Sequence, residues 1–434
     1  MRNKFGVLVE LAAAVRQFFA ASPEEIPVER DEDDEPVNQN DLVEVEEALR
    51  RLLNQSDLWE RADEASLFLP HDADASMVAE GLDQAFRQSA SVRDDDNSDN
   101  LFGETLSTDP MQDIRSPHSL RAACVVYYVC AQGKKGLRRK HAFVEHDSNA
   151  AELESNARVI LFGDWASGIP NARILADYIW QEYVQPVIGK KQQVHLIHLG
   201  DTYYAGLKHE YPKRFSKHWP VRTTEKPPNI FSWTIPGNHG VYAGPHGFYR
   251  MLKEDRRFDA QAKCSHFLIE NKYWQIFGLD TSSTPVDWNG SIGVLHKKQL
   301  EWVIRRRDVN KKCILLTHHQ PFCVCENVDP HLSDQLRPIR EQHPVTAWFW
   351  GHEHLCARFE PHMNIEFPVL LGHAGFPGRP KKRIHDTPKV KFEWTEHVGP
   401  YVSFGFARLD FSNDTIDTRL MNLVNREKHR FMIY

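Results

Sequence analysis

An apolar run that ends in a glycine and an acidic residue decides the fold of this chain: Val194-His195-Leu196-Ile197-His198-Leu199 is followed directly by Gly200-Asp201-Thr202-Tyr203-Tyr204. The run predicts a buried strand, and the polar residues after it predict a loop at the strand's carboxyl end. Open α/β sheets bind their ligands at the carboxyl ends of their strands. This stretch therefore predicts a layered α/β domain with a functional site along one edge of a sheet.

Four further polar clusters occur along the chain, and most of them also follow an apolar run directly. They are Gly163-Asp164, Gly237-Asn238-His239, Thr317-His318-His319 and Gly351-His352-Glu353-His354. A single Gly-Asp after a strand is usually only a turn. The five clusters together, however, offer the carboxylates of Asp164 and Asp201, tyrosine phenols, an amide oxygen and several imidazoles. These donors suit two metal ions held side by side and bridged by a shared carboxylate.

The two carboxylates take different roles in this hypothesis. Two neighbouring cations need an anionic bridge, because otherwise their repulsion drives one of them out. Asp201 is the candidate bridge, since the glycine before it lets the backbone come close to the ions. Asp164 is then a terminal ligand of the first metal.

The remaining donors divide between the two ions. Asn238, through its side-chain oxygen, joins the second metal with imidazoles from His318 and His352. His354 lies two residues beyond His352 along an extended segment and projects on the same side. It therefore reaches the first metal while His352 serves the second.

Alternating strands and helices are expected around these clusters, which is typical of a layered α/β domain. The expected strands are 122–130, 159–162, 231–235, 313–316 and 346–350, with a hairpin over 267–277 and β structure again over 404–420. Helices are expected over 174–187 and 297–306.

The first 118 residues differ in character from the rest. Acidic runs at 29–35 and 94–99 predict solvated linkers, and helical spacing of apolar residues predicts short helices near 42–53 and 77–86. We expect a mainly helical N-terminal extension over residues 1–118, followed by one domain over residues 119–434. The extension carries no recognisable chemistry and is a candidate for docking a protein partner or for regulation.

The composition argues against several classes of protein. A formal net charge of −7 disfavours a surface that coats nucleic acid, and seven irregularly spaced cysteines do not form a disulfide framework in a chain this long. No apolar run approaches the ~20 residues of a membrane span. Glu10 and Arg16 interrupt the apolar start of the chain, which argues against a signal peptide. We expect a cytoplasmic protein without membrane contact, with secretion as the alternative.

The five clusters resemble, in type and order, the motifs of the calcineurin-like metallophosphoesterase superfamily. Its members carry an Asp-containing first motif, then Gly-Asp, Gly-Asn-His, a strand-end His and Gly-His-x-His, and the resemblance covers roughly residues 157–425. It implies a two-sheet α/β sandwich flanked by helices. The roles that the family assigns to the matching residues agree with those given above.

The pattern is most similar to the purple acid phosphatase-like branch and to related bacterial phosphoesterases. Many members of the superfamily place a metal-binding histidine two residues after the first aspartate, where this chain has Ala166. The purple acid phosphatase branch also lacks that histidine and uses a tyrosine three residues after the second aspartate, which is Tyr204 here. A phenolate ligand at this position favours trivalent iron and a visible colour. Gly240 departs from that branch, which usually has an acidic residue there.

The resemblance implies a hydrolase of phosphate esters, acting on monoesters or diesters with a metal-activated hydroxide and two ions of iron, zinc or manganese. His239 and His319 are candidate catalytic residues, because an imidazole can hydrogen-bond the phosphoryl group or protonate the leaving oxygen. Arg358, four residues past His354, is a candidate phosphate contact, with an ordinary surface arginine as the alternative.

The substrate class stays open between a small phosphate ester and a nucleotide. A cyclic-nucleotide phosphodiesterase and a nuclease share this set of ligands, although no basic block of a DNA-binding domain accompanies it here. The rival from another class is a non-catalytic scaffold of the same fold. The complete set of ligand types argues against the scaffold.

Overall fold

The computed structural model describes residues 143–144, 150–168, 170–203, 206, 210–222, 227–241, 244–284, 292–322, 331–376, 388–398, 401–423 and 426–434. The strand expected at 122–130, the N-terminal helices and the boundary at residue 118 lie outside these residues, and they stay predictions.

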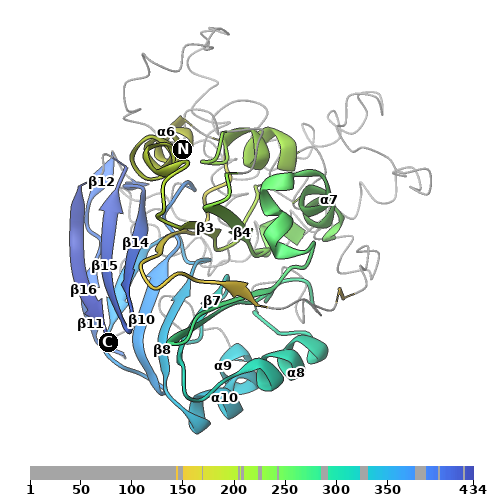
Figure 1. Cartoon of the computed structure of the whole chain (residues 1–434), viewed down its shortest axis with the longest axis vertical. Helices are drawn as coiled ribbons and strands as arrows, with labels where there is room; N and C mark the ends of the chain where they lie inside the picture. Colours follow the sequence, from red (N-terminus) through yellow and green to blue (C-terminus); the bar gives the residue numbers. More distant parts are fainter. Residues whose placement is uncertain are drawn as a thin grey trace, which may run out of the picture. The chain divides into compact units, whose positions relative to one another are not determined.

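Two sheets form the body of the described structure (Figure 1). The first sheet contains β2 Arg158–Phe162, β3 Val194–His198, β4 Ile230–Thr234, β14 Gly405–Ser412, β15 Thr415–Asn422 and β16 Glu427–Ile433. Its strand order is β16-β15-β14-β2-β3-β4. The strands β2, β3 and β4 are parallel to one another, whereas β14 to β16 are antiparallel additions.

The second sheet is the larger of the two. It contains β1 Ala151–Glu152, β5 Phe267–Glu270, β6 Trp274–Gly278, β7 Lys312–Thr317, β8 Val345–Trp350, β9 Cys356–Phe359, β10 Ile365–Leu371 and β11 Val390–Glu393. Its strand order is β1-β5-β6-β7-β8-β10-β9-β11, and β6, β7, β8 and β10 are parallel neighbours. A separate short pair joins β12 His397–Val398 to β13 Tyr401–Val402.

Side chains from both sheets share one apolar core. Leu161 and Trp233 of the first sheet pack in it with Ile314 and Trp348 of the second. The strands β3 and β8 are buried along their whole length, which is why each is a nearly continuous apolar run in the sequence. The two-sheet α/β sandwich is therefore confirmed.

Helices flank the sheets in Figure 1. They are α6 Pro170–Ile179, α7 His246–Glu254, α8 Lys297–Arg306, α9 His331–Gln335 and α10 Arg337–Gln342, with shorter helical turns at η2 Trp180–Val184, η3 Gln185–Val187, η4 Tyr211–Phe215, η5 Ser216–His218, η6 His239–Val241 and η7 Arg256–Gln261. In this view α8 to α10 appear in the lower half with β7 and β8, whereas α6 and α7 appear in the upper half with β3 and β4. Within the described residues, no helix is both long and apolar enough to cross a membrane.

Five parallel strands place the polar clusters. The strands β2, β3 and β4 of the first sheet, and β7 and β8 of the second, each carry one cluster at or just after the carboxyl end. Parallel neighbours end at a common edge, so each sheet brings its own clusters together. The site is thus assembled from loops of both sheets.

Candidate metal centre

Three of the predicted ligands lie at sharp backbone turns. Asp164, Asp201 and His352 adopt φ angles of 58°, 73° and 69°, in the left-handed region that non-glycine residues rarely occupy. Such a backbone costs on the order of 1–3 kcal/mol per residue and persists where the surrounding structure enforces it, often at functional sites. These turns direct the three strand ends toward one shared region.

Glycines of two clusters leave space for carboxylates of two others. A Cβ atom on Gly237 would overlap the Asp201 carboxylate, and one on Gly351 would lie 2.5 Å from Asp164 Oδ2. The glycines of these motifs are therefore required by close approach between clusters that are far apart in the sequence.

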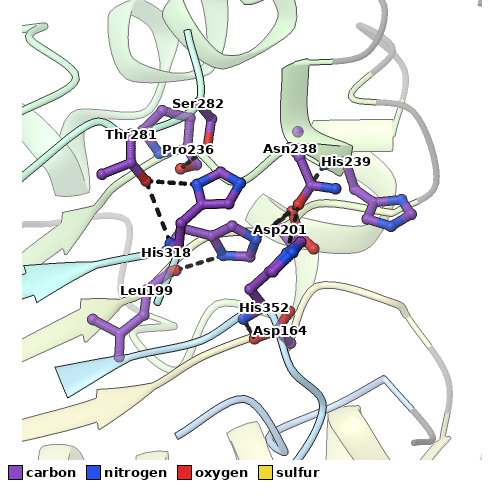
Figure 2. A network of polar contacts seen from close by, with 12 residues as sticks. Asp164, Leu199, Asp201, Pro236, Asn238, His239, Thr281, Ser282, His318 and His352 are labelled. Atoms are coloured by element: carbon purple, nitrogen blue, oxygen red, sulfur yellow. Dashed lines mark hydrogen bonds and ion pairs between the residues drawn. The ribbon is translucent and has the colours of Figure 1, made fainter. Parts of the chain in front are cut away.

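The ligands predicted for the second metal converge on one amide oxygen. Asn238 Oδ1 lies 2.9 Å from His318 Nε2 and 3.1 Å from His352 Nδ1, and His318 Nε2 lies 3.5 Å from Asp201 Oδ1 (Figure 2). Metal–ligand bonds of ~2.0–2.2 Å place neighbouring ligand atoms roughly 3.0–3.5 Å apart. These atoms are therefore spaced as the ligands of one cation would be.

The ring of His318 is held in the tautomer that a metal requires. Its Nδ1 lies 3.0 Å from the carbonyl oxygen of Leu199, which can only accept a hydrogen bond. Nδ1 therefore carries the proton, and the Nε2 lone pair faces Asn238 and Asp201. Burial lowers the pKa of His318, which keeps the ring neutral and able to bind a cation.

The residues predicted for the first metal also meet. Asp164 Oδ1 lies 3.5 Å from His354 Nε2, while Asp164 Oδ2 accepts a hydrogen bond of 2.9 Å from the backbone N–H of His352. The hydroxyl of Tyr203 donates to Asp164 Oδ1 at 3.1 Å and lies 3.1 Å from His354 Nε2. Asp164, Asp201 and His318 also form a group whose donor atoms all lie within 4.8 Å of one another.

The electrostatics of the two carboxylates fit a bound cation. Burial raises the pKa of Asp164 to about 6 and that of Asp201 to about 7, because both side chains are cut off from water. Asp201 Oδ2 is buried and has no hydrogen-bond partner among the described residues. A buried oxygen of this kind is costly unless it is protonated or bound to a cation. The residues present therefore fit metal ions.

Among the described residues, the phenol at this centre is that of Tyr203, the neighbour of the predicted Tyr204. Tyr204 lies outside the described residues, so its role as a ligand stays a prediction. Tyr203 is fully buried, and its ring lies 4.9 Å from that of His239 and 4.5 Å from that of Phe376. Burial and the Asp164 carboxylate raise the pKa of Tyr203 well above its usual value, so the phenol is protonated here.

The two predicted catalytic histidines lie beside the ligands. The backbone N–H of His239 donates to Asp201 Oδ1 at 3.0 Å. The ring of His319 lies 4.7 Å from that of His352, and its Nδ1 lies 2.8 Å from the hydroxyl oxygen of Thr281. His318, His319 and His352 form a second group with donor atoms within 4.8 Å of one another.

Arg358 is held in different surroundings. It lies within β9, and its guanidinium carbon is 4.3 Å from the ring centre of Phe431 and 5.5 Å from that of Phe367. Its Nη1 lies 3.4 Å from His429 Nε2. These contacts join β9, β10 and β16, and the structure does not bring Arg358 to the five clusters among the residues it describes.

A sixth polar cluster contributes to the site and was not predicted. Asp280-Thr281-Ser282-Ser283 follows β6 directly after Leu279. Its Thr281 contacts His319, and its Ser282 hydroxyl donates to the carbonyl oxygen of Pro236 at 3.1 Å. The same signal that marked the other clusters, polar residues after an apolar run, is present here.

Comparison with known proteins agrees with this geometry. The family model of calcineurin-like phosphoesterases matches residues 157–356. Tartrate-resistant acid phosphatase type 5 of Sus scrofa is 22% identical over 268 residues, which cover 57% of this chain and 78% of that protein. Its Homo sapiens counterpart is 24% identical over 280 residues, covering 59% and 84% respectively. The solved structure of GAP50, the anchor in the inner membrane complex of Plasmodium, has a TM-score of 0.46 at 12% identity over 64% of this chain and 88% of that one.

The match over residues 157–356 and the acid phosphatase relatives support the resemblance to the calcineurin-like metallophosphoesterase superfamily that the motifs predicted. The acid phosphatase relatives support the similarity to the purple acid phosphatase-like branch. The chain is accordingly a metal-dependent hydrolase of phosphoric esters, which confirms the expected class of enzyme.

Proposed function

We propose that the chain hydrolyses phosphate esters at two metal ions bridged by Asp201. The observation that carries this proposal is the convergence of two buried carboxylates with an amide and an imidazole. Asn238 Oδ1 lies 2.9 Å from His318 Nε2, and the donor atoms of Asp164, Asp201 and His318 all lie within 4.8 Å of one another. Asp164, Tyr204 and His354 would complete the first site, and Asn238, His318 and His352 the second, with iron, zinc or manganese as the candidate ions.

Different residues of the chain would have different roles around the bound substrate. Metal ions held by these residues would supply positive charge that polarises the phosphoryl oxygens and lowers the pKa of a nearby water molecule. Asp201 offers its orphaned Oδ2 to the ions while the His239 backbone N–H fixes its Oδ1. The imidazoles of His239 and His319 would donate hydrogen bonds to the phosphoryl group or a proton to the leaving oxygen.

We propose a small phosphate ester or a nucleotide as the substrate, with nucleic acid disfavoured by the net charge of −7. Neither a cyclic-nucleotide phosphodiesterase nor a nuclease has a further observation in its favour among the described residues. A scaffold without catalysis is disfavoured by the buried carboxylates, since a binding platform gains nothing from two acidic groups of raised pKa.

The test is metal analysis combined with turnover. The purified chain should contain about two metal ions by plasma mass spectrometry, and it should hydrolyse p-nitrophenyl phosphate or its bis ester. Comparing these esters with cyclic nucleotides then assigns the substrate class. A chain that carries metal but turns over none of them would favour the scaffold.

The phenolate ligand needs its own test, because Tyr203 and Tyr204 are adjacent. Iron-loaded protein should absorb visible light if a phenolate binds the ion. Loss of this band in Tyr204→Phe but not in Tyr203→Phe supports Tyr204, and the reverse result assigns the ligand to Tyr203. A protein without the band in either case has no phenolate on iron.

We also propose that residues 1–118 dock a protein partner or regulate the site, and that the chain acts in the cytoplasm. Removing residues 1–118 and measuring turnover tests regulation, because an autoinhibitory extension predicts faster turnover without it. Unchanged turnover leaves partner docking as the role to test by affinity capture with the extension alone.

A further inference from the structure

The loop that follows β6 is built as a rigid platform. The Asp280 carboxylate accepts hydrogen bonds from the backbone N–H groups of Ser282 and Ser283, at 3.0 and 2.9 Å. The side chain of Gln299 in α8 accepts from the Asp280 N–H at 2.9 Å and donates to its carbonyl oxygen at 2.7 Å. Asp280 and Gln299 are both at most 3% exposed. The residue between the two anchored ends of this turn, Thr281, is therefore fixed in place.

The Thr281 hydroxyl contacts one histidine of the site at two atoms. It lies 2.8 Å from His319 Nδ1 and accepts a longer hydrogen bond of 3.4 Å from the His319 backbone N–H. Thr281 is 1% exposed, so its single hydroxyl proton needs an acceptor within the protein. Among the described residues, the only acceptor in reach of this hydroxyl is His319 Nδ1. The hydroxyl therefore donates to Nδ1, and the ring proton of neutral His319 is on Nε2.

The two adjacent histidines are consequently held in opposite tautomers. In His318 the carbonyl oxygen of Leu199 takes the Nδ1 proton, and Nε2 offers a lone pair to a cation. In His319 the Thr281 hydroxyl occupies the Nδ1 lone pair, and Nε2 offers a proton. A protonated nitrogen cannot bind a metal, but it can donate a hydrogen bond to an anion.

We propose that Thr281 is a positioning residue that keeps His319 out of metal coordination and presents its Nε2–H to a phosphoryl oxygen of the bound substrate. The inference deepens the proposed function and rests on it. It also decides which members of the group His318, His319 and His352 could bind a metal ion. Only His318 and His352 remain as ligands.

The test compares Thr281→Val with Thr281→Ser in the metal-loaded full-length chain. Valine keeps the volume but removes the hydroxyl, whereas serine keeps the hydroxyl. Two readouts are measured, the metal content and the affinity for inorganic phosphate by calorimetry. We expect unchanged metal content in both variants, roughly tenfold weaker phosphate binding in Thr281→Val, and near-normal binding in Thr281→Ser, because valine removes the hydrogen bond that orients the His319 ring.

A double-mutant cycle with His319→Ala separates positioning from a general structural effect. His319→Ala alone should weaken phosphate binding by about tenfold or more, and adding Thr281→Val should weaken it no further. The inference is overturned if Thr281→Val loses metal, if its phosphate affinity is unchanged, or if its effect persists in the His319→Ala background. A parent chain that binds neither metal nor phosphate would instead refute the proposed function itself.

Discussion

Buried histidines occur in two regions of this molecule, and the two regions use them differently. His195 and His198 lie inside β3, whereas His318 and His352 lie just beyond β7 and β8. All four are at most 5% exposed. Those inside the strand are surrounded by aromatic rings, and those beyond the strand ends face an amide oxygen and carboxylates. Burial alone therefore does not identify a functional histidine. The atoms that lie opposite its ring nitrogens distinguish a candidate ligand from a core residue.

The two regions also hold charge differently. Burial lowers the pKa of His195 and His198 to about 3, so both stay neutral. At the strand ends, burial raises the pKa of Asp164 to about 6 and that of Asp201 to about 7. The core thus excludes charge, whereas the site accumulates acidic groups that only a cation can keep ionised at low cost.

The largest effect is expected for Asp201→Asn, which keeps the volume of the side chain but removes the bridging charge. Losing a metal-based stabilisation of several kcal/mol corresponds to a fall in kcat of at least ~10³-fold. Metal content should fall with it, while circular dichroism of the variant stays that of the folded chain. Activity within tenfold of the unsubstituted enzyme would contradict the bridging role.

A matched pair of substitutions sharpens the comparison between the two regions. His318→Ala should lower metal content and lower kcat by ~10²-fold or more, because it removes a predicted ligand. His195→Phe should leave both unchanged and lower the free energy of unfolding by ~1–2 kcal/mol, because the indole N–H of Trp233 loses its acceptor, His195 Nδ1. Loss of metal from His195→Phe would show that the two regions are not separate.

The pH dependence of stability should differ in sign between the regions. With metal removed by chelation, folded Asp201 retains a proton between pH ~4 and ~7 that the unfolded chain releases, so its contribution to stability falls as the pH rises through that window. Asp201→Asn should therefore become more stable than the unsubstituted chain across this range, by on the order of a few kcal/mol. The core histidines have the opposite dependence, but both chains share it and it cancels in the difference.

Urea unfolding of both chains across this pH range measures that difference. A difference that stays constant, or that shrinks as the pH rises, would show that Asp201 is already ionised in the folded metal-free chain.

The smallest effect is expected for Arg358→Met. The guanidinium packs over Phe431 and Phe367, so its loss should cost ~1 kcal/mol of stability. KM should change less than ~2-fold, because these contacts lie outside the ligand set. A roughly tenfold rise in KM would restore Arg358 as a phosphate contact.

The strands that carry the site could be predicted because each is a mostly apolar run followed by polar residues. This holds for β2, β3, β7 and β8, and α8 has the bounds that its spacing predicted. Strands β9, β10, β11 and β16 were not predicted. β16 carries four polar or charged residues before its apolar end, and β10 contains Pro368, so neither pattern distinguishes a strand from a loop.

The predicted ligands that lie within the described residues come together at one site. Two features of that site, however, could not be derived from the spacing of residues in the sequence. Thr281 and His319 are 38 residues apart and come together only because β6 and β7 are neighbours in the sheet. The choice between Tyr203 and Tyr204 depends on side-chain directions within a loop, which counting positions from Asp201 does not provide.

The candidate metal centre takes its predicted ligands from both sheets, and this has a consequence for how the protein assembles. Asp164, Asp201 and Asn238 follow strands of the six-stranded sheet, whereas His318 and His352 follow strands of the eight-stranded sheet. Bound ions would act as cross-links between the two halves of the sandwich. A chain whose sheets had formed but not yet docked would hold no complete binding site, so metal uptake would be a late step in folding and would report that the sandwich has closed.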